Sequence, residues 1–445
     1  MKNDIELTGR IVIPGDRKYS SARKEFNTFF NRYPCVIVFA QNTQDVVNAV
    51  LWAREKDRPF RIRSGRHNYE GLSVVDNGLV IDVSDMKRVE VDSQSGTVTV
   101  QTGLRDFQLA EALGAKGLVV PPGLCPTTGI AGFTLGGGQS SLSRPWGLAT
   151  DNLIEAEMVD ANGRVLRANA NHNDDLFWAL RGGGNGNFGV CTSFKFRTHQ
   201  IDTVAYVAIN WDLCDLKPVL KTWQEYTVPD SDNRLTPLLT IASGQQSLLM
   251  MQGVFLGSAE DLRRLLQPLL QAGTPQQVTI EEIPWLEAAA RIGATQPDTP
   301  EPFKSVGPFV NKLLPDEGID IIQRFISEPP TSSVSVFFHG LGGAVAEVPN
   351  DATAYFYRKA LSNMSFFATW STPEGATPGI RWVEDFRRAM RPFTQGVYVN
   401  TQDLSIKNWP EAYYGSNFKR LTKVKAKYDP ENVFHFPQSI PPACK

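Results

Sequence analysis

Three glycine-rich segments in the first half of the chain constrain its fold more than any other feature. The first covers residues 63–71, the second covers residues 123–138 with six glycines, and the third covers residues 181–189. Glycines gathered in this way usually let a backbone approach a flat or anionic ligand closely. None of the segments matches a Rossmann G-x-G-x-x-G fingerprint or a Walker phosphate loop. Three separate loops therefore indicate an extended ligand such as a dinucleotide, although the first segment alone is equally compatible with an ordinary turn.

The elements around these loops divide the chain, whose 445 residues suffice for two or three domains. In the first part, an apolar run at residues 34–40 predicts a buried strand and the periodic stretch 46–53 predicts a helix. In the middle part, longer strand-like stretches alternate with helices and no glycine-rich phosphate loop occurs, which favours an antiparallel sheet. We therefore predict an α+β fold with three segments: residues 1–203, 204–394 and 395–445.

Composition and charge exclude several classes of function. The 45 Lys and Arg residues nearly balance the 47 Asp and Glu residues, so no global field attracts nucleic acid or an anionic membrane. No run of about 18 apolar residues predicts a membrane span, and the polar N-terminus shows no secretory signal. Five scattered cysteines are too few for a disulfide framework. These features predict a soluble, cytoplasmic protein, although a secreted protein without its signal would look much the same.

Four motifs occur in the order found in one group of flavoproteins. They cover residues 63–71, 125–138, 174–184 and 413–440. The chain thus resembles the berberine bridge enzyme-like proteins, which belong to the vanillyl-alcohol-oxidase group of FAD-linked oxidases with a PCMH-type FAD-binding domain. The resemblance implies that the first and last of the three segments bind FAD together. It also implies that the middle segment is an inserted substrate domain, built on an antiparallel sheet covered by helices.

The resemblance further implies how the cofactor is held. In many members of the family, a histidine of the first loop bonds the flavin 8-methyl carbon and a cysteine before the second loop bonds ring carbon 6. His67 and Cys125 stand at these positions, and imidazole and thiolate suit attack on an electrophilic ring. Without the motif, they would be interpreted as a hydrogen-bonded loop histidine and an unreactive thiol. The other residues implied to contact FAD are Arg63, Ser64, Gly65, Arg66, Asn68, Thr128, Gly129, Gly132, Gly137, Gly189, Val190, Asn400, Tyr414 and Asn417.

The chain departs from the family pattern at three positions. Arg66 replaces a common glycine of the first loop, which predicts an unstrained backbone there and a guanidinium able to contact the pyrophosphate. Phe133 replaces a histidine of the second loop and makes that region drier. Thr401 replaces the second tyrosine of a C-terminal segment in which Tyr398 is retained. Because a threonine cannot act as a base at accessible pH, Tyr398 is the predicted catalytic base unless the substrate domain supplies another.

The middle segment offers other candidates for a functional role. Glu281, Glu282 and Glu287 cluster near Trp285, but carboxylates in such a place more often lie on a solvated helix face. His339 follows a strand-like stretch and can line the substrate cavity or be an ordinary core or surface histidine. Five tryptophans can stack on sugars or polycyclic molecules, or more often fill the core: Trp211, Trp223, Trp285, Trp370 and Trp382.

Together these observations predict an FAD-dependent oxidase. A base takes the hydroxyl proton of a small alcohol or saccharide while hydride passes to FAD. Thr128 is small, which the resemblance associates with reoxidation by O2 and release of H2O2. The alternatives are a dehydrogenase of the same fold with another electron acceptor, and a catalytically inert flavoprotein or coat protein. We predict no metal site and no nucleic-acid or membrane partner, and the oligomeric state stays open.

Overall fold

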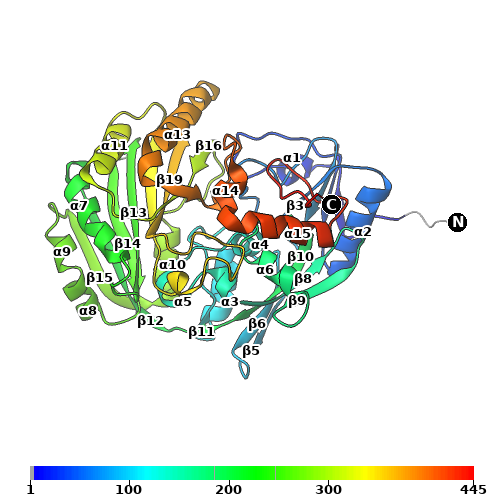
Figure 1. Cartoon of the computed structure of the whole chain (residues 1–445), viewed down its shortest axis with the longest axis horizontal. Helices are drawn as coiled ribbons and strands as arrows, with labels where there is room; N and C mark the ends of the chain where they lie inside the picture. The colour runs from blue at the N-terminus through cyan, green and yellow to red at the C-terminus, as the bar shows by residue number, and fades with distance from the viewer. Residues whose placement is uncertain (1–4, 185, 246, 445) are drawn as a thin grey trace.

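The computed structural model describes residues 5–184, 186–245 and 247–444, which form two lobes (Figure 1). The segments that begin and end the described chain lie in one lobe, and a large sheet with its helices forms the other. Within the described residues, every helix is too short or too polar to span a bilayer. All five cysteines are free.

A small, mainly parallel sheet carries the first glycine loop. Its order is β1 (Arg10–Val12), β2 (Val36–Phe39), β4 (Leu79–Asp82) and β3 (Phe60–Arg63), and only β1 runs antiparallel to its neighbour. Every residue of β2 is buried, as the apolar run predicts. Helix α2 (Thr43–Glu55) follows β2 and is capped by Asn42, whose side chain accepts the backbone N–H of Asp45. The predicted strand and helix are therefore confirmed.

A second sheet in the same lobe is antiparallel. Its order is β5 (Val89–Asp92), β6 (Thr97–Gln101), β10 (Val190–Arg197), β8 (Leu153–Val159) and β9 (Val165–Asn169). Helices α3 (Asp106–Gly114), α4 (Ile130–Leu135) and α6 (Asp174–Leu180) accompany it. Phe194 and Phe196 point from β10 into the core because side chains two apart lie on the same face of a strand. This sheet supports the second and third glycine loops.

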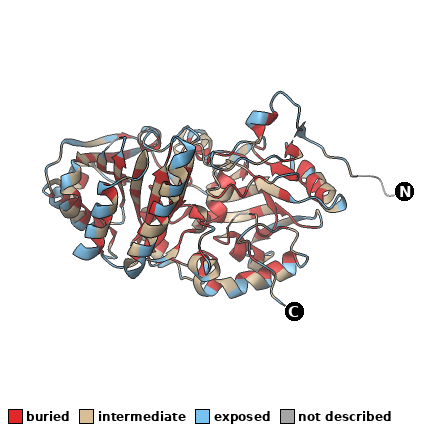
Figure 2. Cartoon of the chain, turned by 90° about the horizontal axis from the view of Figure 1, so that it is seen from above, coloured by how far each residue is buried: buried red, intermediate tan, exposed pale blue. Residues whose placement is uncertain are grey.

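The other lobe is built on an antiparallel sheet of nine strands. Eight follow one another in the order β15 (Gln277–Pro284), β12 (Thr203–Trp211), β14 (Leu248–Phe255), β13 (Leu235–Gly244), β18 (Ser333–Gly340), β19 (Ser362–Thr369), β17 (Pro308–Val310) and β20 (Gln395–Val397), and β16 (Phe303–Val306) pairs with β19. Helices α7 (Leu216–Trp223), α11 (Asp316–Ser327) and α13 (Ala376–Met390) pack on one face. Figure 2 shows these helices with exposed outer turns and buried strands behind them. The opposite face is partly covered by α10 (Trp285–Gly293) and otherwise faces the first lobe.

The C-terminal segment returns to the first lobe. Helix α14 (Trp409–Tyr414) is followed by α15 (Phe418–Tyr428), which packs against α6. Lys425 of α15 is fully buried, and its ammonium donates to the carbonyl oxygens of Asn187 and Phe434, each at 2.6 Å, and to Asp429 at 2.7 Å. The predicted segment boundaries stay a prediction. Strand β12 of the large sheet begins at residue 203, the last residue of the first predicted segment, and β20 places residues 395–397 of the third predicted segment in the large sheet.

The tryptophans and glutamates of the middle segment have structural positions. The five tryptophans are buried in the core, and none of them lines the large cavity described below. Arg291 pairs with Glu281 and Glu287 at half-exposed positions. Stacking platforms and a carboxylate base are therefore not supplied by these residues.

Candidate functional site

A cavity of about 660 Å³ lies between the two lobes. Its walls come from all three glycine segments, from β13, β18 and β19 of the large sheet, and from the Tyr398–Gln402 segment. This volume is typical of a site for a bound organic ligand. The glycine loops predicted from the sequence thus meet at one place.

The first and second loops touch through their glycine backbones. A Cβ atom built on Gly65 would lie 2.1 Å from the nitrogen of Gly129, and one built on Gly129 would lie 2.4 Å from the nitrogen of Gly65. Only glycine permits such a close approach of two backbones. The contact brings His67 and Cys125, which lie 58 residues apart in the chain, to the same cavity wall.

His67 and Cys125 share one hydrogen-bonding neighbour. The His67 Nε2 atom lies 2.9 Å from the Oγ1 atom of Thr127, and the Cys125 Sγ atom lies 3.4 Å from the same oxygen. The ring of Phe26 stacks on the imidazole with centroids 4.2 Å apart. Burial, with a smaller contribution from Arg105, lowers the pKa of His67 to about 4, so the imidazole is neutral at pH 7.

The two arginines of the first loop have different roles. Arg63 is buried: its Nε atom donates to Asp82 at 2.7 Å, and its guanidinium donates to the Ala22 carbonyl at 2.7 Å. Arg66 is partly exposed and donates to the Ser21 carbonyl at 3.2 Å. Its backbone has a φ of 68°, in the left-handed region. The prediction of an unstrained backbone at Arg66 is therefore wrong, because the loop keeps the conformation that a glycine would adopt without strain.

The remaining residues predicted to contact the cofactor fall into two groups. The first group lines the cavity: Ser64, Gly65, Asn68, Thr128, Gly129, Gly132, Gly189, Asn400 and Tyr414. In the second group, Gly137 packs against Tyr355, Val190 is buried in β10, and the Asn417 side chain donates to the carbonyl of Asn350 at 2.7 Å. These three stand behind the described cavity lining, and their contact with a cofactor stays a prediction.

Tyr398 reaches the cavity with its hydroxyl held by N–H donors. The backbone N–H of Gly138 and the side-chain amide of Asn400 each donate to the phenol oxygen at 2.9 Å. Burial raises the pKa of Tyr398 to about 12, and these donors oppose the rise because they favour the phenolate. The Thr401 hydroxyl donates to the Tyr398 carbonyl at 2.8 Å, which fixes the turn that presents the tyrosine.

The large sheet gives the cavity an uncharged wall. Alternate residues of β18 face the cavity, namely Ser333, Ser335, Phe337 and His339, while Val334, Val336 and Phe338 point into the core below the helices. The neighbouring strand β19 adds Asn363, Ser365, Phe367 and Thr369. His339 is therefore both buried and in the cavity wall, and its Nε2 atom lies 2.9 Å from the Ser140 carbonyl oxygen. Hydroxyl, amide and aromatic groups of this kind suit a neutral, hydroxyl-bearing molecule.

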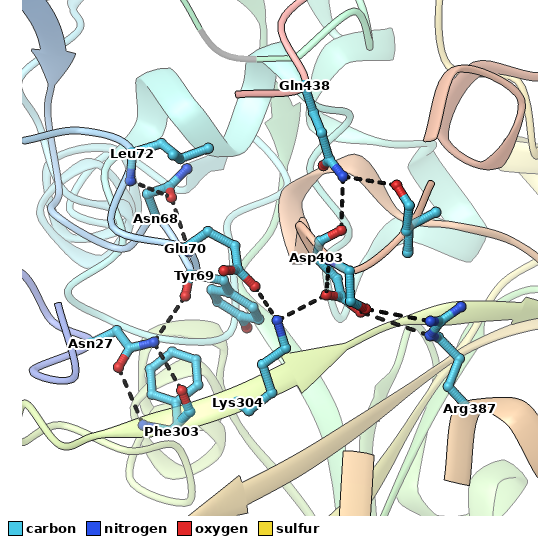
Figure 3. A network of polar contacts seen from close by, with 12 residues as sticks. Asn27, Asn68, Tyr69, Glu70, Leu72, Phe303, Lys304, Arg387, Asp403 and Gln438 are labelled. Carbon is cyan, nitrogen blue, oxygen red and sulfur yellow. Dashed lines mark hydrogen bonds and ion pairs between the residues drawn. The ribbon is translucent and has the colours of Figure 1, made fainter. Parts of the chain in front are cut away.

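A buried ion cluster joins three segments beside the cavity (Figure 3). The ammonium of Lys304 in β16 pairs with Glu70, which follows the first glycine loop, and lies 2.8 Å from Asp403. The Asn27 amide donates to the Tyr69 carbonyl at 2.8 Å and the Phe303 carbonyl at 3.0 Å, which ties the same loop to the same strand. Sequence reasoning missed this cluster, because no local pattern connects its members.

Comparison with known proteins identifies the group. A family model described as an FAD binding domain matches residues 34–169, and one described as berberine and berberine like matches residues 397–441. The uncharacterised FAD-linked oxidoreductase YvdP of Bacillus subtilis is 44% identical over 98% of this chain and 99% of its own length. The chain belongs to the berberine bridge enzyme-like FAD-linked oxidoreductases.

Solved structures agree with this assignment. The structure of Physcomitrella patens BBE-like 1 is similar with a TM-score of 0.91 and 30% identity, over 99% of this chain and 98% of that one. A chitooligosaccharide oxidase is similar with a TM-score of 0.88 and 26% identity over 98% of both chains. The predicted α+β fold, a PCMH-type FAD-binding fold with an antiparallel sheet, is thereby confirmed.

The residues present fit the FAD that this family binds. Among the described lining residues, Arg61, Arg63 and Arg66 are the arginines, Arg63 being paired with Asp82, and Glu301 is the only carboxylate. That balance suits an anionic pyrophosphate. The contact between Gly65 and Gly129 holds the first two loops together, so that both line the same cavity.

Proposed function

We propose that this FAD-linked oxidoreductase is an oxidase of an alcohol group on a carbohydrate or secondary metabolite, with FAD held covalently by both His67 and Cys125. Bound FAD supplies the hydride acceptor, and dioxygen is the electron acceptor, which gives hydrogen peroxide. The observation that carries the proposal is the pair of nucleophilic side chains on one cavity wall, within hydrogen-bond reach of a single hydroxyl.

In this proposal, Tyr398 takes the hydroxyl proton of the substrate. Tyr398 lines the cavity, and the N–H groups of Gly138 and Asn400 stabilise the ionised form of its hydroxyl. The uncharged wall of β18 and β19 orients the substrate by hydrogen bonds with its hydroxyl groups, such as Ser335, with the ring of Phe367 available for stacking. The Asn363 amide instead donates to the carbonyls of Gly307 and Pro308 and shapes the wall. The similarity to a chitooligosaccharide oxidase supports a saccharide as the carbohydrate substrate of this proposal.

The position of Thr128 supports dioxygen as the acceptor. Thr128 lines the cavity three residues after Cys125, and its short side chain leaves space beside the site proposed for the ring. A dehydrogenase that uses another acceptor needs no such space. Stopped-flow reoxidation of the substrate-reduced protein in air separates the two: reoxidation within seconds supports the oxidase, and reduced protein that stays stable for minutes contradicts it.

Two measurements test the rest of the proposal. The purified protein is denatured in acid, and we expect the yellow colour to stay with the polypeptide and peptide mapping to find flavin on both His67 and Cys125. A panel of sugars, benzylic alcohols and polyketide alcohols is then assayed for peroxide release. Activity on any of them excludes the inert flavoprotein or coat protein, whereas flavin that leaves the acid-denatured protein contradicts covalent attachment.

A further inference from the structure

A tight turn fixes the position of Thr127, the residue whose hydroxyl contacts both proposed attachment points. The backbone N–H of Thr128 donates to the Cys125 carbonyl at 3.2 Å, which closes a turn with Pro126 at its second position and Thr127 at its third. Proline presets the backbone for that position. The backbone N–H of Asp106 also donates to the Thr128 carbonyl at 2.8 Å and anchors the turn on α3. The Thr127 hydroxyl is therefore held at a defined place.

That hydroxyl is the centre of a chain of three hydrogen bonds. His67 Nε2 and Thr127 Oγ1 are 2.9 Å apart, Thr127 Oγ1 and Cys125 Sγ are 3.4 Å apart, and the Cys125 thiol donates to the Pro297 carbonyl at 3.6 Å. His67 and Cys125 line the cavity, whereas Thr127 stands outside its described lining. Thr127 thus contacts both nucleophiles from behind.

The donor in each of these three hydrogen bonds follows from the last of them, between the Cys125 thiol and the Pro297 carbonyl. A backbone carbonyl can only accept, so the single hydrogen of the thiol points to Pro297. Cys125 Sγ then accepts the single hydroxyl hydrogen of Thr127, and Thr127 Oγ1 accepts the N–H of His67 Nε2. Because a neutral imidazole carries one N–H, the free lone pair is on Nδ1.

We propose that Thr127 is a positioning residue for covalent flavin attachment, whose hydroxyl holds His67 in the tautomer with a nucleophilic Nδ1 and donates to the sulfur of Cys125. The thiolate is the reactive form of cysteine, and a hydroxyl that donates to it stabilises that form. The inference rests on the proposed function, because it assumes that both residues bind the flavin.

Each attachment is a two-electron oxidation. His67 Nδ1 or Cys125 Sγ gives its electron pair to a new bond with a flavin carbon. At His67, one proton leaves the methyl carbon and one leaves Nε2 by way of Thr127; at Cys125, one leaves the ring carbon and one leaves the thiol. The two electrons released by each bond pass through the ring to dioxygen, the oxidant of the proposed function, which together with the two protons becomes hydrogen peroxide.

The test compares three variants produced in cells and purified with the flavin they retain. Thr127→Val keeps the shape of the side chain and removes the hydroxyl, and Thr127→Ser restores the hydroxyl. Thr222→Val is the matched control, since Thr222 lies on α7 and its hydroxyl donates to the Pro218 carbonyl at 3.0 Å. Peptide mapping by mass spectrometry gives the fraction of chains with flavin on His67 and on Cys125, and circular dichroism reports the fold.

We expect Thr127→Val to lower the rate of each attachment about tenfold, the effect of one lost hydrogen bond to a reacting group. The rate comes from samples taken at intervals during production in the cells, and Thr127→Ser and Thr222→Val are expected to stay near the wild type. Equal attachment in Thr127→Val, a loss at only one of the two residues, or a Thr127→Ser variant as defective as Thr127→Val overturns the inference. A wild type without covalent flavin instead contradicts the proposed function.

A second measurement needs no variant and decides the matter if Thr127→Val does not fold. The flavin-bearing histidine is released by digestion of the wild-type protein, and NMR identifies the substituted ring nitrogen. The direction of the hydrogen-bond chain predicts Nδ1. Substitution at Nε2 overturns the inference, because Nε2 is then not the atom that donates to Thr127.

Discussion

Removal of the ammonium at the centre of the buried ion cluster tests how the lobes are held together (Figure 3). The side chains of Lys304, Glu70 and Asp403 are 12%, 7% and 0% exposed. Lys304→Met keeps most of the apolar length and deletes the charge. In this variant Asp403 keeps two other partners: its carboxylate accepts the backbone N–H of Ser405 at 2.9 Å, and the Arg387 guanidinium lies 3.7 Å away. Among the described residues, Lys304 is the only cation that pairs with Glu70, so Glu70 is left as an uncompensated buried carboxylate.

The expected loss of stability in Lys304→Met and its pH dependence follow from leaving Glu70 without its partner. Breaking a buried ion pair by removing one partner costs about 3–5 kcal/mol of the free energy of unfolding. Burial already raises the pKa of Glu70, and Lys304 opposes the rise. Without Lys304 the folded-state pKa of Glu70 lies still further above its unfolded value. The penalty is therefore full above the folded pKa and is relieved as the pH falls and Glu70 takes up a proton.

Urea unfolding of the wild type and Lys304→Met at pH 8, 7 and 5 measures this effect. We expect the difference in the free energy of unfolding between the wild type and Lys304→Met to be largest at pH 8 and to shrink at pH 5. The double variant Lys304→Met/Glu70→Gln should recover part of the lost stability. Lys217→Met is the control, because Lys217 pairs with Asp320 at positions 33% and 56% exposed, where an ion pair contributes at most about 1 kcal/mol. A loss in Lys304→Met no larger than the control, or one that grows toward pH 5, refutes the reasoning.

Three further predictions concern the loops. His67→Ala and Cys125→Ala should each keep flavin on the acid-denatured chain through the remaining bond, and the double variant should release it; release from both single variants contradicts two attachments. Thr128→Leu should slow reoxidation by dioxygen in stopped-flow experiments while flavin reduction by substrate stays unchanged. Arg66→Gly should be more stable to urea than Arg66→Ala by about 1 kcal/mol, because alanine keeps the strain of a positive φ; equal stabilities would show that the backbone is unstrained.

Much of the first lobe follows from local sequence. The apolar run of β2 and the periodic run of α2 can be predicted because each pattern lies within one short stretch of sequence. The partners that bury them, which include β4 and β8, come from the fold. The three glycine segments predict close backbone approach, and the Gly65–Gly129 contact is the structural reason for two of them. Local pattern also explains the error at Arg66: a bulky residue argues against positive φ, but contacts such as the Phe26 N–H donating to the Arg66 carbonyl at 2.9 Å hold the loop in that shape.

The missed residues act through partners distant in the chain. Thr127 is unremarkable until the fold brings His67, 60 residues away, to its hydroxyl. Lys304 meets Glu70 across 234 residues and Asp403 across 99. The alternation of Ser333, Ser335 and Phe337 with apolar residues predicts a strand. The sequence does not show which face of that strand lines a cavity, because this is decided by the helices that cover the other face.

Two buried groups reach the cavity as candidates for the base, and their pKa values separate them. Burial raises the pKa of Tyr398 to about 12, so its phenolate fraction, and with it the rate of flavin reduction by substrate, should rise about tenfold per pH unit between pH 6 and 9. Burial lowers the pKa of His339 to about 4, and its Nε2 faces the Ser140 carbonyl, so Nδ1 is an acceptor throughout that range and gives a flat profile. Stopped-flow reduction of the wild type, Tyr398→Phe and His339→Gln distinguishes them. A flat profile that survives in Tyr398→Phe and is lost in His339→Gln moves the base from the C-terminal segment to the sheet.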